Sequence, residues 1–201
     1  MNQRSPEWFK ARCGRITGSR FAAVMALGKK GQPLAERRDL VSSLVLERLT
    51  GNVVSVYQNE AMTWGLDNEP KAKDWYMFEK SVVIDEVAFI VHPVLDFVGV
   101  SPDGLVDEEG GCEIKCPYNM ERHLTNIIER KVPEEYLWQV QGCMWVSNRE
   151  WWDFISYDPR FPAYLQGVVV RMYRDDKLID QLENECNEVH EEVETQLEKL
   201  K

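Results

Sequence analysis

The sequence has little of what membrane-spanning, secreted or zinc-dependent proteins require. It contains no run of about 18 apolar residues, so no transmembrane helix and no contact with a membrane are expected. Its first residues lack the apolar stretch of a secretory signal. The five cysteines are odd in number and form no C-x-x-C pair, which favours reduced thiols in a cytoplasm over a disulfide framework. The three histidines are scattered, so a bound metal would need carboxylate ligands.

Positive charge is also scarce, and it is unevenly distributed. The 24 basic and 34 acidic residues give a net charge of −10, which argues against a polyanionic partner. Residues 1–50 nevertheless have a balance of +6, whereas residues 51–174 and 175–201 have balances of −9 and −7. This distribution suits a protein that meets DNA on one face. An unevenly charged, solvated surface explains it equally well.

The length of 201 residues, without repeats or a Ser/Gly-rich linker, predicts a single domain over residues 1–201 with a substantial core. Apolar periodicity and turn signals predict helices over Pro6–Arg12, Phe21–Met25, Leu34–Leu49, Glu60–Lys80, Asn119–Glu129, Pro133–Val146 and Asp175–Leu200. They predict strands over Val82–Val91, Asp96–Val100, Gly111–Cys116, Trp151–Ser156 and Leu165–Met172. Thr17 or Ser19 is expected to cap the second helix, and Pro70 to bend or divide the fourth. The order indicates an α/β or α+β domain with a central mixed sheet flanked by helices.

Two short segments suggest chemistry, Ser101-Pro102-Asp103-Gly104 and Cys112-Glu113-Ile114-Lys115-Cys116-Pro117. Side chains alternate along a strand, so Glu113 and Lys115 are expected on the same face. A tight turn between the strands would bring Asp103 beside Glu113, and two carboxylates that close favour a divalent cation. Mg²⁺ takes oxygen ligands, so the expected donors are Asp103, Glu113 and the carbonyl oxygen of Ile114. Lys115 is then placed to orient or deprotonate a water, or to neutralise charge in the transition state.

Each segment alone also has an ordinary structural explanation. A Glu-x-Lys strand is common as an exposed charge pair, and Pro-Asp-Gly is a frequent turn. In this order and at this spacing, the two segments match the signature of the PD-(D/E)xK nucleases.

Most of the chain resembles the lambda-type phage exonucleases, the YqaJ-like group of PD-(D/E)xK nucleases. The resemblance lies in Trp8-x3-Arg12-x-Gly14-x-Ile16-Thr17-x-Ser19, Trp64-Gly65-x3-Glu69, the two segments above, Tyr136-x2-Gln139-Val140-Gln141-x2-Met144-Trp145 and Tyr157-Asp158-Pro159-Arg160. It implies a restriction-endonuclease-like core.

The resemblance also implies roles for individual residues. Asp103, Glu113 and the Ile114 carbonyl would bind the metal, Lys115 would be the catalytic lysine, and Glu69 would point into the same site. Gln141 aligns with the glutamine of the family's last motif, which would give it a role in catalysis and DNA binding. The alternative is a glutamine on a core-facing helix that only hydrogen-bonds a neighbour. Arg12, Ser19 and Ser101 align with a pocket for the terminal 5′-phosphate, where a guanidinium can donate two parallel hydrogen bonds.

The function implied by the resemblance is a Mg²⁺-dependent 5′-to-3′ exonuclease on double-stranded DNA ends, in which Mn²⁺ substitutes for Mg²⁺. It would release mononucleotides and leave a 3′ single-stranded overhang for a single-strand annealing protein, in phage-type DNA recombination within a bacterial host cytoplasm. Family members form ring-shaped homotrimers, and a basic channel within an acidic exterior would reconcile the local and overall charge.

Two other interpretations remain open from the sequence. A PD-(D/E)xK endonuclease or junction resolvase would share the metal site without needing an end-phosphate pocket. A binding module for DNA ends or proteins would have a degenerate site, against which the intact Asp103, Glu113 and Lys115 argue.

Overall fold

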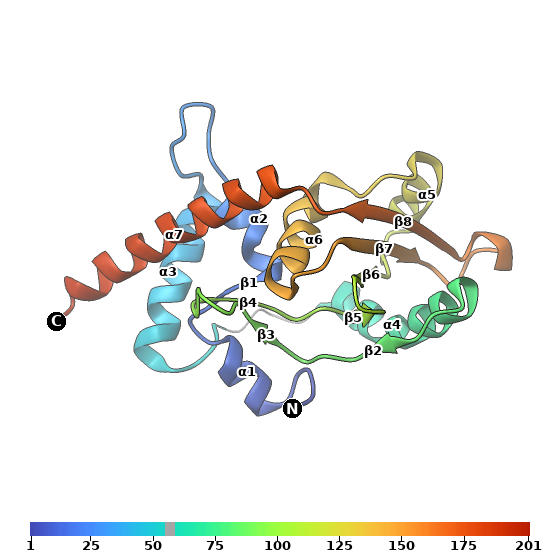
Figure 1. The fold of residues 1–201 in the computed structure, drawn as a ribbon, viewed down its shortest axis with the longest axis horizontal. Coiled ribbons are helices and arrows are strands. Elements are labelled where there is room, and N and C mark those ends of the chain that lie inside the picture. Colours follow the sequence, from blue (N-terminus) through green and yellow to red (C-terminus); the bar gives the residue numbers. More distant parts are fainter. Residues whose placement is uncertain (55–58) are drawn as a thin grey trace.

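The computed structural model describes residues 1–54 and 59–201 and arranges their strands in two sheets (Figure 1). The larger sheet contains, in spatial order, β2 (Ile84–Asp85), β5 (Gly104–Val106), β6 (Gly110–Lys115), β7 (Trp151–Tyr157) and β8 (Gly167–Tyr173). The smaller contains β1 (Ile16–Thr17), β4 (Val98–Val100) and β3 (Ile90–Val91). β6 is parallel to β7 and β1 to β4, while the other neighbours are antiparallel, so both sheets are mixed.

Seven α-helices surround the sheets in the described residues: α1 (Pro6–Arg12), α2 (Phe21–Val24), α3 (Ala35–Thr50), α4 (Glu60–Lys80), α5 (Met120–Glu129), α6 (Glu134–Ser147) and α7 (Asp176–Glu198). Short 3₁₀ turns, η1 (Gly18–Arg20) and η2 (Ala163–Leu165), complete the order. Figure 1 shows α3 and α7 at one end of the molecule and α4 and α5 at the other, with α6 between them. No helix of the described residues is long and apolar enough to cross a membrane.

Alternation along β6 and β7 divides the core between two faces of the larger sheet. Ile114 and Ile155 pack with Tyr76 of α4 on one face. Glu113 and Phe154 lie on the other, where they contact Gln139 and Tyr136 of α6. A β-carbon at position 110 or 111 would lie 2.1 or 2.3 Å from the Trp151 or Trp152 indole, so glycine is required where β6 begins. The sheet thereby holds the end of β6 between α4 and α6.

Most predicted elements are confirmed, with four corrections. The Val82–Val91 segment forms two short strands in different sheets, because its middle crosses from the edge of one sheet to the other. Gly104, expected in the turn-like Pro102-Asp103-Gly104, instead begins the strand Gly104–Val106, which pairs with β6. Neither Thr17 nor Ser19 caps α2, whose N-cap is Arg20. Pro70 lies inside α4, which continues through it for 21 residues.

Candidate active site

Pairing of β5 with β6 brings the carboxylate and lysine residues together. Gly104 is the register partner of Cys112, so Asp103, directly before β5, lies next to Glu113. The Asp103 Oδ2 atom accepts a hydrogen bond of 2.7 Å from the Ile114 backbone N–H. Glu113 and Lys115 project from the same face of β6, and the Lys115 ammonium forms an ion pair with Glu113 Oε1. Glu113 and Lys115 therefore share one face of the strand, as strand alternation predicts.

One oxygen of Glu113 is left without a partner in the described residues. Glu113 is 2% exposed, and its Oε1 accepts hydrogen bonds from Lys115 Nζ and, at 2.6 Å, from Gln139 Nε2. Its Oε2 atom is buried and accepts none. A buried carboxylate oxygen without a donor is costly, and a divalent cation would satisfy it. The donor chemistry of this corner, two carboxylates and the Ile114 carbonyl, suits Mg²⁺.

The electrostatics of the pair agree with that interpretation. Burial and the neighbouring charge of Glu113 together raise the pKa of Asp103 to about 8. Burial alone would lower the pKa of Lys115, but Glu113 and Asp103 together raise it above its usual value. The two carboxylates thus repel each other, and one ammonium does not compensate both. No three His, Cys, Asp or Glu side chains of residues 1–54 and 59–201 form a ready metal-binding group.

Glu69 of α4 lies close to this group without touching it. Its two oxygens are 3.5 Å from Arg4 Nη2 and 3.4 Å from Lys73 Nζ. The Glu69 charge contributes to the raised pKa of Asp103, which places it in the same electrostatic environment. Glu69 also lines the cleft that Lys115 lines.

Gln141 requires a correction, because its amide is used elsewhere. Its Nε2 donates to the Tyr173 carbonyl at 2.9 Å and its Oε1 accepts from the Asp175 N–H at 2.9 Å, which joins α6 to the segment between β8 and α7. The glutamine that reaches the site is Gln139, on Glu113 Oε1. Gln139 lies three residues after Tyr136, whose ring centroid is 5.0 Å from Lys115 Nζ, so these two share one helix face.

A second polar group lies where α1 meets the turn before β5. The Ser101 Oγ atom accepts hydrogen bonds from Trp8 Nε1 at 2.8 Å and Arg12 Nη1 at 3.0 Å. Arg12 also donates to Thr17 Oγ1 at 3.3 Å, and its guanidinium lies 4.2 Å above the Trp8 ring. Trp8 was not singled out from the sequence, although it heads the block that contains Arg12. With both acceptor positions taken, the Ser101 hydroxyl is free to donate its proton to an anion.

Arg12 carries a charge that no ion pair in the described residues balances. Burial and the neighbouring charge of Arg20 together lower its pKa to about 10, against a smaller opposing effect of Glu47. Arg20 is paired with the buried Glu47, so Arg12 is the guanidinium of the two that is left for an added anion. Arg12, Ser19 and Arg20 all line one cleft of about 1460 Å³, which also contains Glu69 and Lys115. Members of the expected phosphate pocket and of the expected metal site thus line the same cleft, whereas Ser101, Asp103 and Glu113 are not among its described lining residues.

Comparisons with known proteins identify a related family and related structures. The model of the family described as the YqaJ-like viral recombinase domain matches residues 7–150. The structure resembles that of an alkaline exonuclease (LHK-Exo) from Laribacter hongkongensis, with 39% identity over 98% of this chain and 96% of that chain and a TM-score of 0.89. The same exonuclease in complex with dAMP gives a TM-score of 0.90 at 39% identity, with the same coverage.

A more distant resemblance concerns the fold alone. A phage-related exonuclease from Haemophilus somnus 129PT has 14% identity over 93% of this chain and 96% of that chain, with a TM-score of 0.79. No curated protein is significantly similar to the chain. The match to the Laribacter exonuclease and the mixed sheets confirm the fold expected from the sequence. That fold is a mixed α/β domain with a restriction-endonuclease-like core.

Proposed function

The chain belongs to the YqaJ-like viral recombinase family and is a close structural homologue of an alkaline exonuclease, and on this premise we propose that it is a Mg²⁺-dependent exonuclease that degrades one strand of double-stranded DNA from its 5′ end. It releases mononucleotides and leaves a 3′ overhang. The observation that carries the proposal is the single cleft lined both by Arg12 and by Ile114 and Lys115. Asp103 and Glu113 adjoin it through their hydrogen bonds with Ile114 and Lys115. The dAMP bound by the Laribacter exonuclease is consistent with a nucleotide product.

Specificity for a 5′ end follows from the second polar group of the cleft. A terminal phosphate carries one to two negative charges near neutral pH. Arg12 offers it a guanidinium without a carboxylate partner, and Ser101 offers it a hydroxyl whose lone pairs are already occupied. Ser19, exposed at the edge of the same cleft, adds a further donor. The strand that ends in this pocket presents its next phosphodiester to the carboxylates.

The hydrolytic roles follow from the contacts of β6 and α6. Asp103, Glu113 and the Ile114 carbonyl would hold Mg²⁺, which supplies Lewis acidity and an activated water when bound, and Mn²⁺ takes the same ligands. Gln139 holds Glu113 Oε1, which leaves Oε2 for the cation. The Lys115 ammonium donates hydrogen bonds beside the carboxylates and stabilises the negative charge that develops on the phosphoryl oxygens. Glu69 adds a carboxylate to the same cleft.

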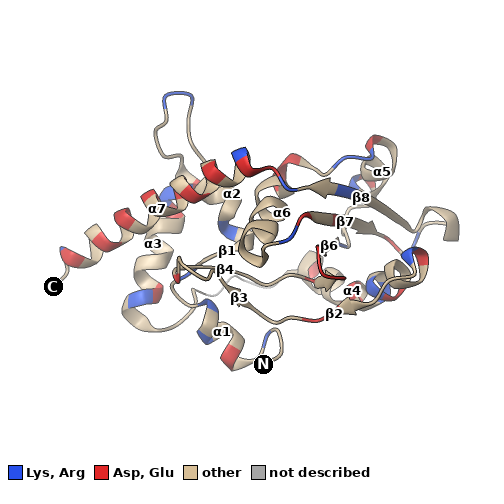
Figure 2. Cartoon of the chain, viewed as in Figure 1, with Lys and Arg blue, Asp and Glu red and all other residues tan. Residues whose placement is uncertain are grey.

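We also propose a role for this activity in recombination and an assembly in which it takes place. The 3′ overhang would pass to a single-strand annealing protein during phage-type recombination in a bacterial host cytoplasm. Residues 1–201 would act as one domain of a homotrimer around DNA. The acidic residues that recur along α7, away from α4 and α5 in Figure 2, suit an exterior position in such an assembly. A monomer in light scattering at micromolar concentration would contradict this part.

The polarity of digestion and the product are tested with one duplex, in which a strand is labelled either at its 5′-terminal or at its 3′-terminal nucleotide. Digestion with Mg²⁺ should release a label on the 5′-terminal nucleotide first and as a mononucleotide, and a 3′-terminal label last. The Glu113→Ala variant is the control for contaminating nucleases, and it should release neither. Release of the 3′-terminal label first, or of oligonucleotides, would contradict the proposed polarity and product.

A further inference from the structure

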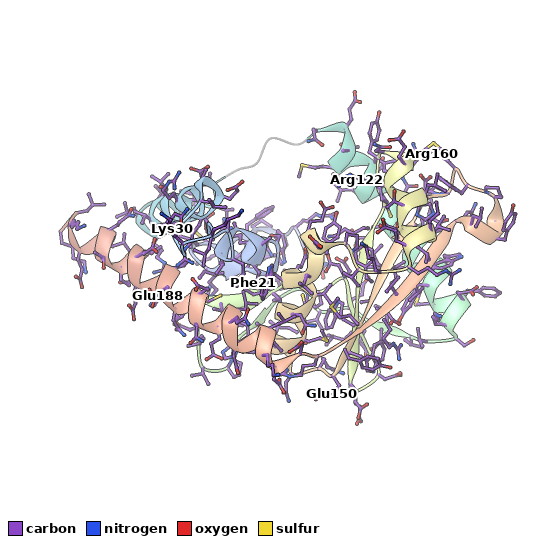
Figure 3. The ribbon with its side chains drawn as sticks, turned by 90° about the horizontal axis from the view of Figure 1, so that it is seen from above. Phe21, Lys30, Arg122, Glu150, Arg160 and Glu188 are labelled. Carbon is purple, nitrogen blue, oxygen red and sulfur yellow. The ribbon has the colours of Figure 1, made fainter. Side chains whose placement is uncertain are left out.

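Two of the blocks that carry the family resemblance contain residues with no role in the site described so far, and the structure brings these residues together. Trp64 lies on α4 and Arg160 follows β7, and the Arg160 guanidinium stacks on the Trp64 ring at 4.2 Å. Neither side chain is among the described residues that line the cleft, although their neighbours Gly65, Leu66, Pro117 and Tyr118 do line it. Figure 3 shows Arg160 at the α4 and α5 end of the molecule, opposite Lys30 and Glu188. The pair therefore lies just outside the cleft.

Arg160 is itself fixed by a buried carboxylate. Its Nε and Nη2 atoms donate to Asp158 Oδ1 at 2.8 Å and Oδ2 at 2.7 Å, and its backbone N–H donates to Oδ1 at 2.9 Å. Asp158 is fully buried at the end of β7, beside the end of β6. Burial would raise the pKa of Asp158, but its hydrogen bonds from Arg160 keep it below the usual value. A planar guanidinium held along two edges has little rotational freedom.

The same guanidinium holds the chain that leaves the catalytic strand. Arg160 Nη2 also donates to the carbonyl oxygens of Pro117, at 3.2 Å, and Tyr118, at 3.0 Å. These are the second and third residues after the last residue of β6, Lys115. A lysine at position 160 could not serve this set of acceptors and stack on Trp64 at once, because its three donors radiate from a single atom.

We propose that Arg160, held by Asp158, is a positioning residue that fixes the end of β6 against α4 and so fixes Lys115 relative to Glu69. Trp64 is five residues before Glu69 on α4, and Pro117 is two residues after Lys115, so one side chain connects the elements that carry both groups. Hydrolysis depends on such distances, since a displacement of about 1 Å can cost about 100-fold in rate. This inference rests on the proposed function, because it assigns Arg160 to that same reaction.

The chain contains a matched control for this arrangement. Arg171 of β8 donates two hydrogen bonds, of 2.8 and 2.9 Å, to the buried Asp153 and stacks 3.5 Å from the centroid of Trp151. The guanidinium, buried carboxylate and indole are therefore the same three groups. Arg171 lines no part of the cleft in the described residues and donates to no carbonyl near Lys115. Its loss should affect stability without moving the end of β6.

The experiment compares Arg160→Gln, Arg160→Lys and Arg171→Gln. For each, kcat and KM are measured with Mg²⁺ on a 5′-phosphorylated duplex, together with Tm and amide hydrogen exchange of residues 114–120. We expect both Arg160 variants to lower kcat at least about tenfold with KM within about twofold of wild type. Exchange of residues 114–120 should increase in both. Arg171→Gln should keep kcat within about twofold and leave that exchange unchanged.

Three outcomes overturn the inference. The first is a kcat for the Arg160 variants equal to that of Arg171→Gln, and the second is a rise in KM at unchanged kcat, which would make Arg160 a DNA contact. The third is unchanged exchange of residues 114–120 in folded Arg160→Lys. Failure of wild type to release nucleotides would instead reject the proposed function, and hydrogen exchange would still decide whether Arg160 holds the segment.

Discussion

Replacing Arg12 with alanine removes a partly buried guanidinium that donates to Ser101 Oγ and Thr17 Oγ1. With no ion pair in the described residues, its charge is available to a terminal phosphate. A hydrogen bond between charged groups contributes about 1.5–3 kcal/mol, which corresponds to about 10- to 150-fold in binding or rate. The Asp103–Glu113–Lys115 group remains, so activity should fall without vanishing. The loss should be concentrated on substrates that carry the 5′-phosphate.

The assay is the ratio of initial rates on duplexes with a 5′-phosphate and with a 5′-hydroxyl. Arg12→Ala should lower this ratio by about 10- to 150-fold. Arg15→Ala is the matched control, because it removes the same charge from the same segment while Arg15 donates only to the Asp96 and Ala11 carbonyls in the described residues. Its ratio should equal that of wild type. If Arg12→Ala slows both substrates equally, Arg12 has no part in recognising the phosphate.

The remaining predictions concern the carboxylates, the lysine and the two glutamines. Asp103→Ala and Glu113→Ala should abolish hydrolysis while DNA binding in a gel-shift assay stays equal or becomes stronger, since a repulsive carboxylate is gone; lost binding would contradict this. Lys115→Ala should retain less than about a tenth of the rate, a barrier increase above about 1.4 kcal/mol, and a higher residual rate would exclude its catalytic role. Gln139→Ala should raise the Mg²⁺ concentration for half-maximal rate at nearly unchanged Tm. Gln141→Ala should instead lower the free energy of unfolding by about 1–3 kcal/mol at an unchanged Mg²⁺ requirement, and the reverse pattern would restore Gln141 to the site.

The fold was most predictable where a segment's own pattern determines its structure. The apolar run of β7 and the amphipathic α7 were both predicted, and the apolar positions Ile179, Leu182 and Val189 of α7 are buried. The three residues of β5 follow Pro102-Asp103, which has the composition of a turn, and only pairing with β6 makes them a strand. The division of residues 82–91 between two sheets likewise depends on neighbours far along the chain.

The candidate site shows the same division between local and tertiary information. Alternation along one strand predicted that Glu113 and Lys115 share a face, and a turn predicted Asp103 beside them. Which glutamine of α6 reaches Glu113 could not be deduced, because residues 139 and 141 are both polar positions on an apolar helix and only the packing of α6 orients them. The contact of Trp8 with Ser101 joins residues 93 positions apart, and no local pattern marks it.

The most direct test of the central claim is a time course with two substrates that differ only in having ends. A 5′-phosphorylated linear duplex and the same sequence as a covalently closed circle are incubated with the protein and Mg²⁺, with Asp103→Ala as the inactive control. We predict steady release of mononucleotides from the linear duplex, dependent on Mg²⁺, and no cut in the circle. Cleavage of the circle would show an endonuclease with the same site, and no release from the linear duplex would show that this cleft binds DNA without hydrolysing it.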